Sequence, residues 1–138
     1  METSWVVTAI QPQLWVNAGS SAVSFYANAF GARTVHIVGA GEDIVAQLAI
    51  GDAVFWIATA GPSHERLVPH ALGGSTGRLL LVVDDPAAVQ AGAVAAGAVE
   101  KSPVAQEHGW LVGRVLDPDG HEWEIGKPLN EWPPCCSR

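Results

Sequence analysis

Charged residues are scarce in this chain, and basic residues are the scarcest of them. Only 15% of the 138 residues are charged, and 14 acidic residues against 7 basic ones give a net charge of −7. A nucleic-acid-binding domain normally carries a basic stripe, and the sequence has none, so we expect no DNA or RNA partner. The apolar content of 49% is typical of a globular protein and argues against disorder.

Long hydrophobic runs are also missing. The longest uninterrupted aliphatic run is the segment 79–83, whereas a membrane helix needs roughly 20 apolar residues. The N-terminus lacks the basic, apolar and small-residue order of a secretory signal. We therefore expect a cytoplasmic protein without a membrane segment, and the length predicts one domain over residues 1–138.

Cysteine is too rare for a disulfide framework. The two cysteines, Cys135 and Cys136, are adjacent and follow two prolines near the C-terminus. We interpret them as free thiols on a frayed tail. A vicinal disulfide or a metal clip is the alternative.

Tryptophan, by contrast, is abundant. Six indoles would crowd the core of so short a chain, so we expect some to line a surface or a cavity, where an indole offers a flat apolar face and one donor. The six are Trp5, Trp15, Trp56, Trp110, Trp123 and Trp132.

The two halves of the chain repeat one pattern. The segment LWVNAGSSAVSFYANAFGA at 14–32 matches LLVVDDPAAVQAGAVAAGA at 80–98, and FWI at 55–57 matches WEI at 123–125. Such a repeat predicts two similar structural units. We place the modules at about 6–60 and 77–127, joined by an exposed loop at 61–76 that is rich in proline and glycine.

The first module has the pattern of a strand, a helix and three strands. Ser20 or Ser21 is expected to cap the helix and Gly31 to end it. The helix is predicted by apolar residues spaced i, i+3, i+4, i+7 and i+8, which are Ala22, Phe25, Tyr26, Ala29 and Phe30. β-Branched and aromatic residues between turn signals predict strands at 6–16, 33–39, 44–50 and 53–59.

The second module has the same order. Asp85 is expected to cap its helix, with Pro86 at the first position, and Gly97 to stop it. Strands are predicted at 78–83, 98–104, 110–116 and 122–126, with a tight Asp-Pro-Asp-Gly turn at 117–120. The fold class is therefore α+β, with two βαβββ modules whose curved mixed sheet surrounds a cleft.

The period of two along a strand assigns side chains to the two faces of each sheet. We expect one face to pack against the helix, through Leu14, Val16, Leu48, Ile50, Phe55, Ile57, Leu79, Leu81, Trp123 and Ile125. We expect the other face to line the cleft, through Gln11, Gln13, Trp15, Gln47, Trp56, Arg78, Glu122 and Glu124. Trp110 lies near the beginning of the strand at 110–116, and His36 lies on the second strand. A β-bulge would reverse these assignments.

Four segments carry a family resemblance. They are LWV…SAVSFYANAFGA, VAQLAIGDAVFWIA, GRLLLVVDDPAAVQAGAVAAGA and GRVLDPDGHEWEI. In this order they resemble the vicinal oxygen chelate superfamily, which contains glyoxalase I, bleomycin-resistance proteins and extradiol dioxygenases. The resemblance covers about residues 8–127. It implies paired βαβββ modules and a homodimer.

Enzymes of that superfamily hold a divalent metal with four side chains, and the resemblance places those positions at Gln11, Trp56, Arg78 and Glu124. Glu124 suits a metal and Gln11 is a weak ligand. An indole only donates and a guanidinium is always protonated, so neither can bind a cation. We therefore expect no cofactor. We interpret Arg78 and Glu124 as an ion pair on the cleft floor, or alternatively Arg78 as a fork for an anionic or carbonyl group of a ligand.

Two functions fit these residues. The first is a metal-free protein that captures a small, aromatic or cationic, antibiotic-like molecule in a Trp-lined cleft. Its candidate ligand-binding residues are Gln11, Gln13, Trp15, Gln47, Trp56, Arg78, Trp110, Glu122 and Glu124. The alternative is a lyase, isomerase or dioxygenase of the superfamily type that has a non-standard metal site or uses Glu124 or His36 as its base.

Overall fold

The computed structural model describes residues 4–134, so the Cys135–Cys136 pair lies outside the described part of the chain. Two four-stranded sheets have the orders β1-β4-β3-β2 and β5-β8-β7-β6. The first module consists of β1 (Gln13–Val16), α1 (Gly19–Phe30), β2 (Arg33–Ala40), β3 (Asp43–Ile50) and β4 (Ala53–Thr59). The second consists of β5 (Arg78–Val82), α3 (Pro86–Ala95), β6 (Val99–Glu107), β7 (Trp110–Leu116) and β8 (Glu122–Pro128). The predicted fold of two βαβββ modules is confirmed.

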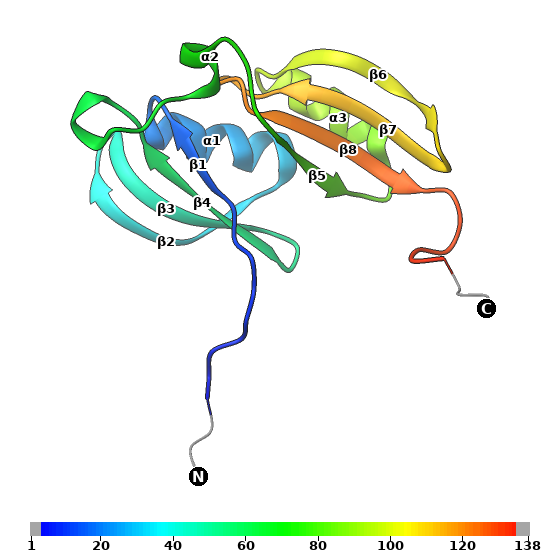
Figure 1. Cartoon of the computed structure of the whole chain (residues 1–138), viewed down its shortest axis with the longest axis horizontal. Helices are drawn as coiled ribbons and strands as arrows, with labels where there is room; N and C mark the ends of the chain where they lie inside the picture. Colours follow the sequence, from blue (N-terminus) through cyan, green and yellow to red (C-terminus); the bar gives the residue numbers. More distant parts are fainter. Residues whose placement is uncertain (1–3, 135–138) are drawn as a thin grey trace.

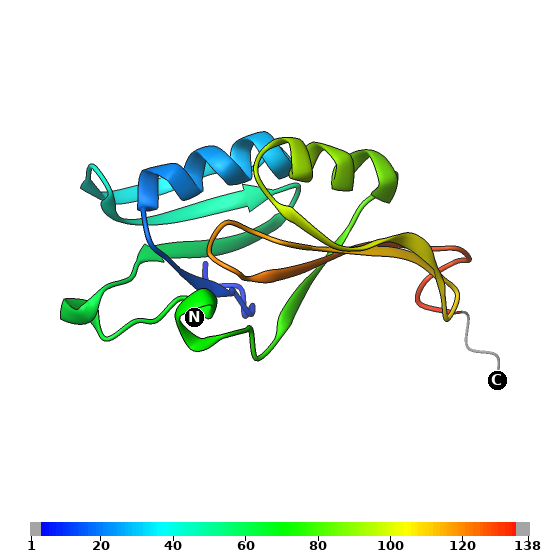
Figure 2. The same ribbon diagram turned by 90° about the horizontal axis from the view of Figure 1, so that it is seen from above.

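Both modules use the same strand pairing. The first strand of each runs parallel to the last, and the other neighbours are antiparallel. Helices α1 and α3 lie next to each other in one layer, with both sheets beneath them (Figures 1 and 2). One face of each sheet is therefore covered by a helix. We call the uncovered faces the first open face, on β1–β4, and the second open face, on β5–β8.

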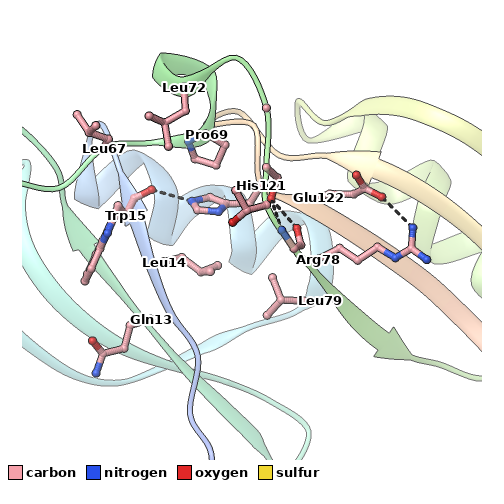
Figure 3. Close-up of a pocket in the computed structure, with 14 residues that line it drawn as sticks. Gln13, Leu14, Trp15, Leu67, Pro69, Leu72, Arg78, Leu79, His121 and Glu122 are labelled. Carbon is pink, nitrogen blue, oxygen red and sulfur yellow. Dashed lines mark hydrogen bonds and ion pairs between the residues drawn. The ribbon is translucent and has the colours of Figure 1, made fainter.

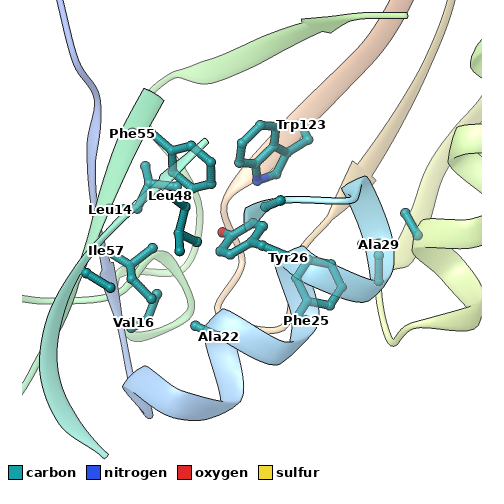
Figure 4. Close-up of a cluster of buried hydrophobic side chains, with 14 of the residues drawn as sticks. Leu14, Val16, Ala22, Phe25, Tyr26, Ala29, Leu48, Phe55, Ile57 and Trp123 are labelled. Carbon is teal, nitrogen blue, oxygen red and sulfur yellow. The ribbon is translucent and has the colours of Figure 1, made fainter. Parts of the chain in front are cut away.

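A single core spans the two modules. Tyr26 is 1% exposed and Trp123 is 3% exposed, and their ring centroids are 5.6 Å apart. Trp123 also lies 5.6 Å from Phe55 (Figure 4), and 4.9 Å from Phe30. Each large apolar side chain buried in this way contributes about 1.5–3 kcal/mol. Because Trp123 comes from β8, the second module completes the core of the first.

Polar contacts between the modules come from the turn at 117–120. Asp119 Oδ1 accepts a hydrogen bond from the backbone N–H of Asn17 at 3.0 Å. Two residues further on, the Nε2–H of His121 donates to the backbone oxygen of Trp15 at 2.7 Å. The turn predicted from Asp-Pro-Asp-Gly is present, and it docks the second module onto β1. His121 is consequently half-buried rather than fully exposed.

The strand predicted at 6–16 is wrong over most of its length. Only Gln13–Val16 forms β1, and the chain before it leads away from the sheets (Figure 1). Pro12 explains the limit: its carbonyl accepts from the N–H of Trp56 at 2.8 Å, but proline has no N–H with which to extend the ladder. The β-branched and aromatic residues before Pro12 are left exposed, with Trp5 at 89% and Ile10 at 96%.

The predicted serine cap of α1 is also wrong. Ala18 is the N-cap residue and makes no side-chain cap. Glu42, from the β2–β3 turn, instead accepts hydrogen bonds from the N–H groups of Ser20 at 2.9 Å and Ser21 at 3.4 Å. The hydroxyl of Ser20 also donates to Glu42. This hydrogen bond first, and then those from the two N–H groups, lower the pKa of Glu42. A carboxylate from a distant turn therefore replaces the local cap, which the spacing of serines along one helix cannot reveal.

The other predicted helix ends agree with the structure. Gly31 ends α1 in the left-handed conformation, with φ 70°. Asp85 caps α3, accepting from the N–H of Ala88 at 3.2 Å, and Pro86 is its first residue. Gly97 follows directly after the C-cap of α3.

The loop between the modules is more ordered than predicted. It contains a 3₁₀ turn at Pro62–His64 and the short helix α2 (Pro69–Leu72), and Val68 is only 4% exposed. The N–H of His70 donates to the carbonyl of Asp119 at 3.2 Å. A Cβ at Gly120 would lie 2.7 Å from Nδ1 of His70. Glycine at this position therefore lets α2 pack on the intermodule turn. None of the helices within residues 4–134 is long and apolar enough to span a membrane.

Candidate functional site

The period-two assignment of faces agrees with the burial of the side chains. The predicted helix-facing residues of β1, β3, β4 and β8 are buried or pack against the core, as do Leu79 and Leu81 of β5. Trp15 and Trp56, at the opposite parity, are half-buried on the first open face. Strand register places four side chains in one row across this face: Gln13, Trp56, Gln47 and His36.

Two glutamines and an indole form a hydrogen-bonded group on the first open face. Oε1 of Gln11 accepts from Nε1 of Trp56 at 2.8 Å and from Nε2 of Gln47 at 3.2 Å. The amide oxygen of Gln11 thus accepts two hydrogen bonds. This group fixes the edge of the Trp56 ring and leaves its flat face for packing.

A pocket of about 220 Å³ lies beside this group on the first open face. Its lining comes from β1, β3, β4 and the intermodule loop: Gln13, Trp15, Val45, Trp56, Ala58 and Arg66. The guanidinium of Arg66 lies over the indole of Trp15, with Cζ 4.9 Å from the ring centroid. Sequence reasoning missed Arg66, because a loop position has no periodicity that indicates where its side chain points.

The second open face carries a continuous series of ion pairs. Glu122 pairs with Lys101 at 2.7 Å and with Arg78 at 3.3 Å. Glu124 pairs with Arg78 at 3.4 Å and with Arg114 at 2.8 Å. Arg114 also pairs with Glu107 at 3.1 Å. We call these six residues, Lys101, Glu122, Arg78, Glu124, Arg114 and Glu107, the charge ladder.

The charge ladder holds three cations and three anions, so its charges balance. Hydrogen bonding from Lys101 lowers the pKa of Glu122, and hydrogen bonding from Arg114 lowers that of Glu107. A carboxylate with a lowered pKa is a weak general base. Lys101, Glu107 and Arg114 were missed from the sequence, although Arg114 shares the alternating parity of Trp110 and Val112 and is identifiable from that signal.

A pocket of about 350 Å³ lies against the charge ladder. Arg78, Glu124, Trp110 and Leu80 contribute to its lining, together with His108 from the β6–β7 turn. His108 has φ 51° and Gly109 has φ 83°. Positive φ at both central residues is what a two-residue hairpin turn requires, so the backbone of His108 is explained by the turn.

A second pocket of about 350 Å³ lies between the modules, beneath the intermodule loop (Figure 3). Strands β1 and β5 form its walls through Gln13, Trp15 and Arg78. Leu67 and Leu72 of the loop close one side. The two open faces are therefore joined by a hollow at the intermodule seam.

The candidate residues proposed from the sequence are divided between the two faces. The first open face holds Gln11, Gln13, Trp15, Gln47 and Trp56, and the second holds Arg78, Trp110, Glu122 and Glu124. His36 is exposed on β2 and lines none of the three pockets. The expected pair of Arg78 and Glu124 is present, and it lies within the second module rather than across the seam.

The four positions that the resemblance assigned to a metal do not suit one. On the first face, the oxygen of Gln11 is occupied by the indole N–H of Trp56. On the second, the Arg78 guanidinium lies beside Glu124 and would repel a cation. Residues 4–134 contain no group of three or more His, Cys, Asp or Glu side chains that could hold a metal ion.

Comparison with known proteins assigns the chain to a family. The family model described as Glyoxalase/Bleomycin resistance protein/Dioxygenase superfamily matches residues 7–125. The chain belongs to this superfamily. An uncharacterized protein of Mycobacterium tuberculosis is 32% identical over 132 residues, covering 91% of this chain and 78% of that protein. A relative in Mycobacterium bovis, also uncharacterized, shows the same identity over 87% of its length.

Several solved structures share the fold. A gene product from Arabidopsis thaliana has 29% identity and a TM-score of 0.68, covering 87% of this chain and 98% of that one. TioX from Micromonospora has 24% identity and a TM-score of 0.69, covering 89% and 100%. The fosfomycin resistance protein FosX from Listeria monocytogenes has 13% identity and a TM-score of 0.67, covering 88% and 93%. At these identities the last two show the fold alone.

Proposed function

We propose that this protein is a metal-free binding protein of the glyoxalase/bleomycin resistance superfamily that captures a small planar molecule. One observation carries the proposal. The four positions at which superfamily enzymes hold a metal form the Gln11–Trp56 hydrogen bond and the Arg78–Glu124 ion pair. Together the two pairs supply a single carboxylate, that of Glu124, which already pairs with Arg78, whereas a metal site needs several anionic or imidazole ligands.

The tryptophans of the first open face support a planar ligand. Trp15 and Trp56 both line the 220 Å³ pocket and are half-buried. Ligand sites are typically apolar hollows with a few placed polar groups, and an indole gains from stacking on another flat ring. The net charge of −7 would favour a cationic ligand, but each carboxylate of the charge ladder already pairs with a cation. Stacking is therefore the interaction on which the proposal relies.

A second copy of the chain is the partner we propose, with the open faces at the interface. Leu80 and Val82 on β5 are 48% and 55% exposed, and Val38 on β2, on the same face as His36, is 57% exposed. Apolar side chains gathered on uncovered sheet faces are typical of an association surface. Such a homodimer would turn the open pockets into closed clefts, and we propose that it acts in the cytoplasm.

A ligand-binding experiment tests this function. A library of fluorinated aromatic fragments would be screened against the purified protein by ¹⁹F NMR without added metal. Binding is expected to be lost in Trp56→Ala and Trp15→Ala and only weakened in Glu124→Gln. Trp5→Ala, at an indole that is 89% exposed before β1, is the matched control. Fragments that bind Trp56→Ala as well as the parent protein would contradict the proposal.

The enzyme alternative gives the opposite result. If a fragment is converted to a product, and Glu124→Gln or His36→Ala stops the conversion while binding persists, the protein is an enzyme. The same NMR samples, followed over hours, report this outcome.

A further inference from the structure

Arg66 differs from the other cations near the candidate site in having no carboxylate partner. Lys101, Arg78 and Arg114 all pair with glutamates of the charge ladder. No ion pair to an Asp or Glu within residues 4–134 involves Arg66. The pocket that it lines contains no acidic side chain.

The guanidinium of Arg66 is held in place by neutral groups. Its Nη1–H donates to the backbone oxygen of Thr59 at 3.3 Å, and its Cζ lies over the Trp15 ring, 4.9 Å from the centroid. A guanidinium has five N–H donors. One of them has a partner within the described residues, so most of the fork is left for another acceptor.

The backbone around Arg66 is also fixed. Its carbonyl accepts from the N–H of Gly61 at 3.3 Å, which closes the loop into a small bridge. Glu65 precedes it with φ 55°, a left-handed conformation that non-glycine residues adopt only where the surroundings impose it. Glu65 is the last residue of the loop 62–65 that this bridge closes, so its conformation belongs to the turn. The loop thus presents Arg66 to the pocket in one defined position.

We propose that the pocket on the first open face recognises the carboxylate of a flat aromatic ligand through Arg66. The ring stacks against the indoles of Trp15 and Trp56, and the carboxylate oxygens accept from the free edge of the guanidinium. The planar fork matches a carboxylate in a bidentate arrangement, which a lysine cannot reproduce. This inference rests on the proposed binding function and specifies the ligand class as an aromatic carboxylate.

Three probes that share the same aromatic ring and differ in the charge of one substituent test the proposal. They are 4-(trifluoromethyl)benzoate, 4-(trifluoromethyl)benzamide and 4-(trifluoromethyl)benzylammonium, titrated into the full chain and followed by ¹⁹F NMR. The benzoate is expected to bind about tenfold or more tightly than the benzamide, since hydrogen bonds to a charged group are the stronger ones. The ammonium compound is expected to bind most weakly.

Variants of Arg66 and a matched arginine complete the test. Arg66→Gln is expected to weaken benzoate binding much more than benzamide binding and so to remove the preference, and the benzamide binding that remains shows that the pocket is still folded. Arg66→Lys is expected to restore only part of the preference. Arg33→Gln is the control, because Arg33 donates to the backbone oxygen of Gly51 at 3.2 Å and does not line the pocket.

The outcomes separate this inference from the proposed function. Equal affinity for benzoate and benzamide, or an unchanged preference in Arg66→Gln, overturns the carboxylate subsite and leaves a charge-independent binding protein. If none of the three probes and no fragment of the library binds, both proposals fail.

Discussion

The hydroxyl of Tyr26 donates a hydrogen bond to the carboxylate of Asp117, which lies 91 residues further along the chain and in the other module. Their exposed fractions are 1% and 2%. Burial first, and then the Asp117 charge, raise the pKa of Tyr26 well above its usual 10.0. The tyrosine therefore remains neutral and keeps its proton for this contact. One buried hydrogen bond thus joins helix α1 to the turn between β7 and β8.

Replacing Tyr26 with phenylalanine is expected to destabilise the fold. The substitution keeps the ring and removes the hydroxyl donor, which leaves the buried Asp117 carboxylate with one partner fewer. We expect the free energy of unfolding to fall by about 1–3 kcal/mol, measured by urea denaturation. Ser24→Ala, at an exposed position of the same helix, is the control. A loss in Tyr26→Phe no larger than in the control would mean that this contact adds no stability.

Stability is expected to depend on pH through Asp119. Burial raises the pKa of Asp119 above its usual 3.8, and the N–H of Asn17 only partly opposes this. Because the folded state holds the proton more tightly than the unfolded state, the stabilisation is present at low pH and is lost as the pH rises through the raised pKa.

The substitution Asp119→Asn tests this sign. The asparagine keeps an acceptor for Asn17 and cannot ionise. We expect the free energy of unfolding of the parent protein, relative to Asp119→Asn, to decrease as the pH is raised from 3.8 toward neutrality. Asp52→Asn, at an exposed turn position, controls for the substitution itself. A relative stability that rises over this range would reverse the assignment.

Added divalent metal is expected to leave the protein unchanged. Arg78 repels a cation at the position next to Glu124, and Gln11 is already hydrogen-bonded to Trp56. Native mass spectrometry with Zn²⁺, Ni²⁺, Mn²⁺ or Fe²⁺ should therefore show no stoichiometric tight binding. Stoichiometric uptake that disappears in Glu124→Ala would refute the metal-free proposal.

A charge on the second open face is expected to weaken the proposed homodimer. Leu80→Glu places a carboxylate at a 48% exposed position on β5, where burial by a second copy would require its desolvation. Sedimentation velocity should show a shift from dimer to monomer. Val94→Glu, at a 41% exposed position of α3 on the helical side, should leave the dimer intact. Equal effects of the two substitutions would place the interface elsewhere.

Periodic elements were predictable from the sequence because each depends on local spacing. The apolar stripe of α1 and the alternation of Phe55, Trp56 and Ile57 assigned the helix and the faces of the sheet with no knowledge of neighbouring strands. The match of 14–32 to 80–98 then indicated that one plan occurs twice.

Contacts between distant residues were not predictable in this way. The cap of α1 comes from Glu42, and the partner of Trp15 in the pocket is Arg66, a loop residue. Neither position shows a pattern along the chain, because tertiary structure alone brings these groups together. The late beginning of β1 is different, because Pro12 is visible in the sequence and its missing N–H outweighs the β propensity of the residues before it.

The shared aromatic core has a consequence for biosynthesis. Trp123 packs on Tyr26, Phe30 and Phe55, yet it is made long after them. A nascent first half leaving the ribosome therefore carries an unfinished core, with large aromatic rings that lack their final partner. The molecule completes its core only after residue 123 has emerged, and until then the first half exposes apolar surface of the kind that favours aggregation.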